Sequence, residues 1–176
     1  MYNYIVDYTQ ADLGTITEPV TVAEAKQYCR VSNDVEDDLF EELITQSRQA
    51  VEKAANISIT PKTINLWFTN LAGGYELPFG PVTSFTSLTD QNGNAIPNTV
   101  YKLVGGPNPS LFWPLYANML AVYTTGMATV PKELKIAILD QINYGYENRG
   151  MDVNDLGICE KTWRVCQRWT RLSPIL

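Results

Sequence analysis

The pattern of apolar and polar positions predicts two long helical stretches separated by a stretch of different character. Apolar residues recur at the helical period from about residue 34 to 55, and again from 131 to 148. A shorter helix is predicted over 22–29, because Thr21 and Glu24 have the spacing of a capping box at its start. At 1.5 Å per residue, the first long helix, of about 22 residues, would be long enough to serve as the spine of the molecule.

Between the two long helices the period changes from helical to twofold. Residues 63–70, 82–88 and 118–126 are rich in β-branched and aromatic residues, which is typical of strands. The dipeptide Asn92-Gly93 is the strongest two-residue signal for a hairpin turn. We therefore expect residues 82–89 to pair with 95–104, followed by a loop over 105–116.

The last segment predicts a short basic amphipathic helix that ends before Pro174. Its apolar side carries Trp163, Trp169 and Leu172. Its other side carries three arginines, Arg164, Arg168 and Arg171. Tryptophans interleaved with arginines are able to stack on single-stranded bases, but two tryptophans at helical spacing more often form an interface.

Together these elements predict an α+β fold. We expect a helical core of two long helices plus short N-terminal and C-terminal helices, with a small β-rich insertion between the long helices. The 176 residues are enough for a single domain over 1–176, with the insertion at 57–128 and the tail helix at 158–176.

Composition argues against several kinds of chemistry. The chain has no histidine, and its three cysteines form no CxxC pair, so we expect no structural zinc, no histidine-dependent catalysis and no cofactor. The longest apolar stretch, 111–123, is too short to cross a membrane and contains Pro114 and Asn118. No secretory signal is visible at the N-terminus.

Charge is distributed unevenly within a net charge of -6. Residues 1–56 contain 11 acidic and 4 basic residues, whereas 160–176 contain 1 acidic and 4 basic residues. Five of the carboxylates gather at the start of the first long helix: Glu36, Asp37, Asp38, Glu41 and Glu42. Such a cluster could hold the metal ion of a hydrolase, but carboxylates in a first helical turn usually complement the helix dipole or face solvent.

Five segments, taken in order, resemble the head-tail connector (adaptor) family of tailed bacteriophages. They are EPVTVAEAKQYCRV, NDVEDDLFEELITQSRQAVEKAANISITPKT, LPFGPVTSFTSLTDQNG, VYTTGMATVPKELKIAILDQINYGYENRG and TRLSPIL. Each segment is weakly specific alone, but together they cover residues 18–176 in the order of the family. The basic tail helix with its tryptophans departs from the short LxPYR-like ending that the family leads us to expect.

The resemblance implies a structural virion protein without enzymatic activity, made in the host cytoplasm and located in the virion neck. It implies a ring of twelve copies that docks under the portal protein, extends the DNA channel and carries the stopper or tail-completion protein. Double-stranded DNA would pass through during packaging and ejection without specific binding, which a net acidic chain permits. The alternative is a nucleic-acid-binding accessory factor of DNA packaging that uses the basic C-terminal helix.

Three sets of residues follow as candidate contact sites. Portal binding is predicted for the tail helix, at Trp163, Arg164, Arg168, Trp169, Arg171 and Leu172. Channel lining is predicted for the carboxylates Glu36, Asp37, Asp38, Glu41 and Glu42, which would repel DNA phosphates. Contact with a neighbouring subunit or the tail is predicted for the loop aromatics Phe112, Trp113 and Tyr116.

Overall fold

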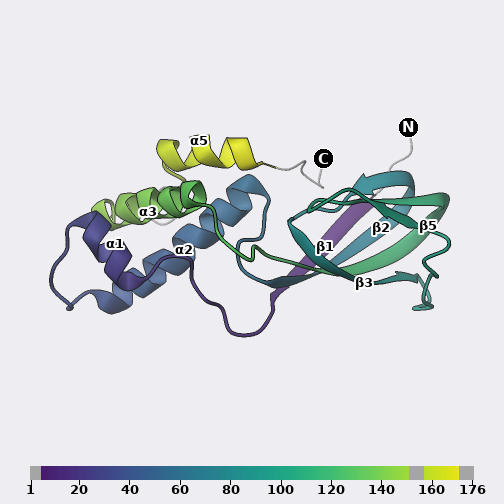
Figure 1. Ribbon diagram of the computed structural model, residues 1–176, viewed down its shortest axis with the longest axis horizontal. Helices are drawn as coiled ribbons and strands as arrows, with labels where there is room; N and C mark the ends of the chain where they lie inside the picture. The colour runs from purple at the N-terminus through teal and green to yellow at the C-terminus, as the bar shows by residue number, and fades with distance from the viewer. Residues whose placement is uncertain (1–4, 151–156, 171–176) are drawn as a thin grey trace. The chain divides into compact units, whose positions relative to one another are not determined.

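Helices and strands are segregated into two compact units (Figure 1). The computed structural model describes residues 5–150 and 157–170, with their side chains except those of 5–6, 70–72 and 114–117. The helical unit contains residues 17–55 and 128–170, and the β unit contains the N-terminal residues up to 16 together with 56–127.

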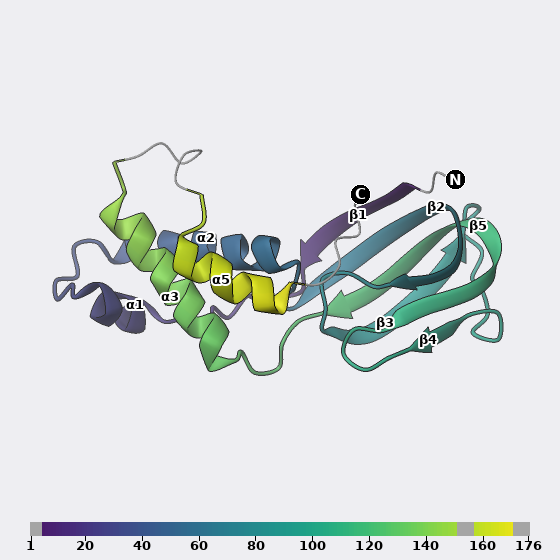
Figure 2. The ribbon, with the colours of Figure 1, turned by 90° about the horizontal axis from the view of Figure 1, so that it is seen from above.

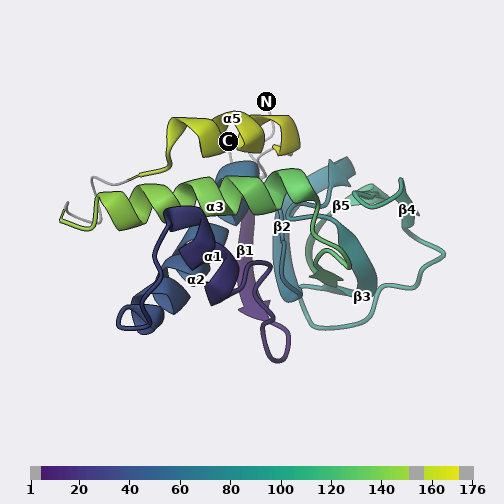
Figure 3. The ribbon, with the colours of Figure 1, turned by 60° about the vertical axis from the view of Figure 1, so that its left-hand side comes forward.

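The helical unit is built around the apolar faces of its two longest helices. Its described elements are α1 (Val22–Cys29), α2 (Asp37–Ala55), α3 (Lys132–Glu147) and α5 (Glu160–Trp169). Helix α2 contributes Phe40, Ile44 and Val51 to the core, and α3 contributes Leu134 and Ile138. These residues lie four or seven positions apart, so each helix buries one stripe against the other. Helix α5 packs on both α2 and α3 (Figure 3).

The predicted start of α1 is confirmed. Thr21 Oγ1 accepts a hydrogen bond from the Glu24 amide, and the Glu24 carboxylate accepts one from the Thr21 amide at 2.8 Å. These two bonds satisfy amide groups that the first turn of a helix leaves without partners.

The described residues of the β unit form one antiparallel sheet of five strands. They are β1 (Ile5–Asp12), β2 (Lys62–Glu76), β3 (Val82–Asp90), β4 (Lys102–Val104) and β5 (Ser110–Thr125). The strand order is β1-β2-β5-β3, with β4 paired to the first residues of β5 (Figure 2). Strands β2 and β5, of 15 and 16 residues, form the centre of the sheet.

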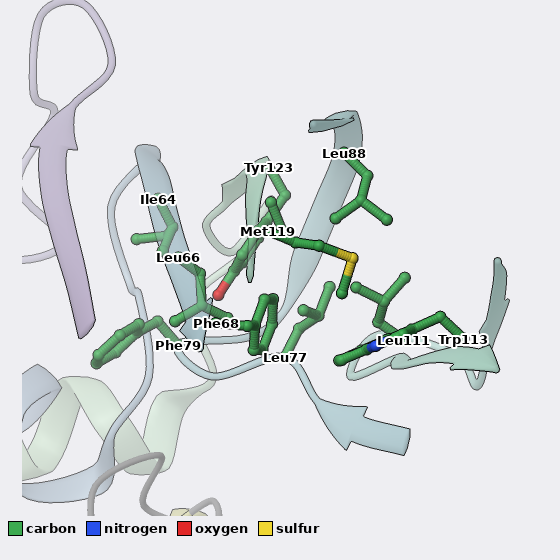
Figure 4. Close-up of a cluster of buried hydrophobic side chains, with 11 residues drawn as sticks. Ile64, Leu66, Phe68, Leu77, Phe79, Leu88, Leu111, Trp113, Met119 and Tyr123 are labelled. Carbon is green, nitrogen blue, oxygen red and sulfur yellow. The ribbon is translucent and has the colours of Figure 1, made fainter. Parts of the chain in front are cut away.

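The β unit has an apolar core of its own (Figure 4). In β2, alternate residues Ile64, Leu66 and Phe68 point into this core, as the twofold period predicts. The core is completed by Leu77, Phe79, Leu88, Leu111, Trp113, Met119, Ala121 and Tyr123. The Tyr123 hydroxyl is buried among them and donates to the carbonyl oxygen of Pro78 at 3.0 Å.

The predicted fold class was wrong. The four described helices have 8, 19, 16 and 10 residues, and α2 is shorter than its prediction because it begins at Asp37 rather than near residue 34. Within residues 5–150 and 157–170, α2 and α3 form the core of the helical unit only, and they are not a central core for the whole chain. The strands form a five-stranded sheet with its own core rather than a small insertion. Strand β1, which precedes all the described helices in the sequence, also belongs to this sheet.

The predicted hairpin was also wrong. Residues 90–94 do turn, with Gly93 N–H donating to the Asp90 carbonyl and Asn94 N–H to the Asp90 carboxylate. Beyond this turn, Thr89 and Ala95 form only an isolated bridge. The strand that pairs with β3 along its length is β5. Part of the predicted loop 105–116 is strand, because β5 begins at Ser110.

Candidate interaction surfaces

The five predicted channel-lining carboxylates do not act as one group. Glu36 accepts a hydrogen bond from the Tyr146 hydroxyl at 2.7 Å, which ties the start of α2 to the end of α3. Asp37 is paired with Lys26 of α1 at 2.6 Å, and Lys26 also contacts Asp34 at 2.5 Å. Hydrogen bonds to Asp34 and Asp37 raise the pKa of Lys26. Two of the five carboxylates therefore hold the helical unit together.

The other three carboxylates form an exposed acidic stripe on α2. Asp38, Glu41 and Glu42 lie three and four positions apart on one side of the helix, and all are exposed. Within residues 5–150 and 157–170, no ion pair neutralises them. The same described residues contain no group of three His, Cys, Asp or Glu placed to hold a metal ion. The acidic stripe stays a predicted contact surface.

The two described arginines of the predicted portal-binding helix are paired within the chain. Arg164 contacts Glu160 on the same helix at 2.5 Å, and Arg168 pairs with Glu133 in the first turn of α3. Trp169 Nε1–H also donates to Glu133, at 3.0 Å. These bonds from Trp169 and Arg168 lower the pKa of Glu133. Arg171 and Leu172 lie outside the described residues.

Helix α5 is an integral part of the helical unit. Thr162 and Cys166 are fully buried, and Thr162 Oγ1–H donates to the Ala137 carbonyl at 2.9 Å. Burial raises the pKa of the Cys166 thiol to about 11, so the thiol stays protonated at neutral pH. By contrast, Trp163 is 43% exposed. Of the two described tail tryptophans, Trp163 is therefore the one that is available to a partner.

The three predicted loop aromatics occupy different environments. Phe112 is 44% exposed, whereas Trp113 is 5% exposed and belongs to the core of the β unit. The side chain of Tyr116 lies outside the described residues. The Phe112 ring lies over Gly74, where an added Cβ would be 2.3 Å from Cε1 of the ring. Gly74 thus provides the room in which this ring lies.

A groove between α2, α3 and α5 was not predicted from the sequence. It has a volume of about 710 Å³, and among its described lining residues Lys53 is the one charged side chain. The lining is mainly apolar or small, with Leu43, Ala50, Ala54, Gly145, Gly157, Ile158 and Trp163, and the polar part comes from Gln46, Ser47, Gln49 and Gln141. The small residues Ala50, Ala54 and Gly145 were the one sign of this groove in the sequence. They did not predict it, because small residues also occur where helices pack closely together.

Gln141 builds one wall of this groove. Its side-chain Nε2–H donates to the Gly157 carbonyl at 3.0 Å, and its Oε1 accepts from the Cys159 amide at 2.8 Å. Both ends of the amide are therefore used to hold residues 157–159 beside α3. This contact joins α3 to the segment that leads into α5, and it positions Gly157 and Ile158 in the lining of the groove.

Comparison with known proteins gives a match to one family model and a shared fold. Residues 19–104 match the model of the phage gp6-like head-tail connector protein family. No curated protein matches the chain. Among solved structures, a chain from the neck of an empty gene transfer agent (GTA) particle, computed with C6 symmetry, has a TM-score of 0.69 at 18% identity. The similarity covers 95% of this chain and 97% of that one.

Two further solved structures have the same fold. A chain in the virion of a native GTA particle has a TM-score of 0.64 at 18% identity, over 94% of this chain and 97% of that one. A chain in the neck of a native GTA particle, computed with C12 symmetry, has a TM-score of 0.60 at 18% identity, over 92% and 97% of the two chains.

Proposed function

We propose that this protein is a structural subunit of a virion neck, as its resemblance to head-tail connector proteins of tailed phages and the match to their family model suggest. The observation that carries the proposal is the match over residues 19–104. Similarity of fold to neck proteins along 95% of the chain supports it, because both units of this chain have counterparts there.

In this proposal the subunits form a closed ring of twelve copies. A ring needs two complementary surfaces on each subunit, since a contact repeated around an axis must use a different patch on each side. The symmetries C6 and C12, with which the neck structures of the GTA particles were computed, are compatible with twelve copies. The ring docks under the portal protein, continues its DNA channel and supports a stopper or tail-completion protein.

DNA passes through the ring during packaging and ejection without specific binding. Tight binding of duplex DNA depends on many Lys and Arg residues that release counterions, and this chain has 13 of them against 19 Asp and Glu. The proposal is therefore favoured over a DNA-binding accessory factor. The structure adds that Arg164 and Arg168 would have to leave Glu160 and Glu133 in order to contact phosphate.

Particles that lack the protein test this proposal. A nonsense mutation in its coding sequence should give heads without tails, while the same particles made with the protein supplied from a plasmid should carry tails. Electron microscopy counts the two kinds of particle, and antibody labelling of complete particles should locate the chain at the head-tail junction. Tailed, infectious particles that contain none of the chain would contradict the proposal.

A further inference from the structure

We propose that the groove between α2, α3 and α5 receives the N-terminal end of α2 from a second copy of the chain. In this contact Val35 enters the groove, and the acidic stripe of Asp38, Glu41 and Glu42 faces Lys53 of the neighbour. The inference rests on the proposed function, because it describes the contact between adjacent subunits of the ring.

The groove has the composition of a protein contact. Its apolar lining includes the half-exposed ring of Trp163, and aromatic side chains are enriched where interfaces are buried. Lys53 lies in the last turn of α2 and is exposed, and no ion pair neutralises it within the described parts of the chain. An occupant that is apolar at its tip and negatively charged beside it would complement this lining.

The start of α2 has these properties. Val35 is 90% exposed, which leaves an apolar side chain in water just before the helix begins. The acidic stripe follows it immediately on the exposed side of the helix. Along α2, the exposed side chains are thus acidic near the N-terminal end, uncharged at Gln46 and Gln49, and basic at Lys53.

The two surfaces cannot meet within one copy. Residues 38 and 53 belong to one continuous helix, whose rise of 1.5 Å per residue separates them by about 22 Å. A second copy can bring its own acidic end to Lys53 while its own groove stays open to a third copy. Repetition of this contact is head-to-tail, which is the kind of interface that closes into a ring.

The inference gives two sets of predicted residues a different role. The acidic stripe lies between subunits rather than along the channel, and Trp163 contacts a second copy rather than the portal protein. A contact of Trp163 with the portal protein and a contact with a second copy of the chain predict different crosslinks from residue 163.

A photoreactive side chain in the groove identifies its occupant. Trp163→p-benzoylphenylalanine keeps an aromatic side chain at this position, and particles assembled with this variant are irradiated and digested. We expect crosslinked dimers of the chain in which residue 163 is joined to a peptide containing Val35, Asp38, Glu41 or Glu42. The control is Trp67→p-benzoylphenylalanine, since Trp67 of the β unit is similarly exposed, at 38%, and should not give this adduct.

Charge reversal provides a second measurement on the full chain. Lys53→Glu alone, and Glu41→Lys with Glu42→Lys, should each reduce the amount of chain in purified particles by about tenfold, because like charges then face each other. All three changes together should restore it. Circular dichroism of each purified variant checks that the helices have formed.

Each outcome of these experiments either supports or overturns the inference. Adducts between residue 163 and the start of α2 in a second copy, together with rescue by the combined variant, support it. Adducts only with another virion protein, adducts elsewhere in the chain, no adduct, or wild-type incorporation of the charge-reversed chains overturn it and leave the proposed function standing. Complete particles without the chain would instead contradict the proposed function.

Discussion

At the scale of single residues, Gly126 shows how one position limits the choice of amino acid. Its φ of +135° lies in a region that residues with a Cβ rarely adopt, and an added Cβ would be 2.9 Å from the Cα of Pro61. The obstacle is backbone, which cannot move aside as a side chain can. Its amide also donates to the Pro81 carbonyl at 3.0 Å, so the residue joins two segments of the β unit.

Gly126→Ala should therefore destabilise the β unit by about 2 kcal/mol or more, from the strained φ and the contact with Pro61. The free energy of unfolding is measured in urea, with tryptophan fluorescence as the signal. Gly106→Ala is the matched control, because an added Cβ at Gly106 meets nothing within 4 Å. Equal stability of the two variants would show that the chain relaxes around residue 126.

At the scale of elements, α5 determines how much of the predicted tail is free to bind a partner. A tail that only docks on a portal would leave the helical unit intact when it is removed. Instead, Thr162 and Cys166 are fully buried, and Glu133 fixes Arg168 and Trp169 to α3. Deletion of residues 160–176 is thus expected to expose apolar surface of α2 and α3 and to destabilise the helical unit.

Cys166→Asp should destabilise the helical unit by about 3 kcal/mol or more, because it places a charged carboxylate at a fully buried position that now holds a small thiol. Gln167→Asp places the same side chain on the exposed side of α5 and should change the stability by less than about 0.5 kcal/mol. Thermal unfolding followed by circular dichroism at the helical band compares the two. Similar unfolding midpoints would mean that α5 is detached in solution.

The Glu133 contact predicts a dependence of stability on pH. Trp169 and Arg168 lower the pKa of this carboxylate below its ordinary value of 4.5. A group whose pKa is lowered by folding contributes stability above its unfolded pKa and loses this contribution as the pH falls through the folded pKa. Between pH 6 and pH 3 the wild type should therefore lose more stability than Glu133→Gln.

Urea unfolding at several pH values measures this difference. Arg168→Gln combined with Trp169→Phe removes the partners of Glu133 while keeping the carboxylate, and should flatten the pH profile in the same way. If both variants reproduce the wild-type profile, the contact does not contribute to the stability of the helical unit.

At the scale of the whole molecule, the balance of charge limits the kind of contact with DNA. The net charge of -6 and the in-chain pairing of Arg164 and Arg168 leave little basic surface. We expect the purified chain not to retain linear duplex DNA in an electrophoretic shift assay, even at low salt, where electrostatic binding is strongest. A shift that disappears steeply as salt is added would contradict a passive conduit and favour the accessory-factor alternative.

Local patterns in the sequence determined the helices and several of the strands. The capping box at Thr21 was predictable because its two partners are three residues apart, and the twofold period of residues 63–70 was predictable because one face of β2 is buried. The resemblance to head-tail connectors was also present in the sequence, in the order of its segments, and the family match confirmed it.

Only the tertiary structure decided which distant segments meet. The Asn-Gly turn signal concerns neighbouring residues only, so it could not show that β3 pairs with β5. Nor could a local pattern show that β1 pairs with β2, because α1 and α2 lie between these strands in the sequence. The buried Arg48, at 1% exposure between Glu18 and Glu52, is a charged residue that no apolar pattern marks as core. The groove lined by Lys53 and Trp163 likewise exists only when three helices pack, because each residue alone resembles ordinary surface.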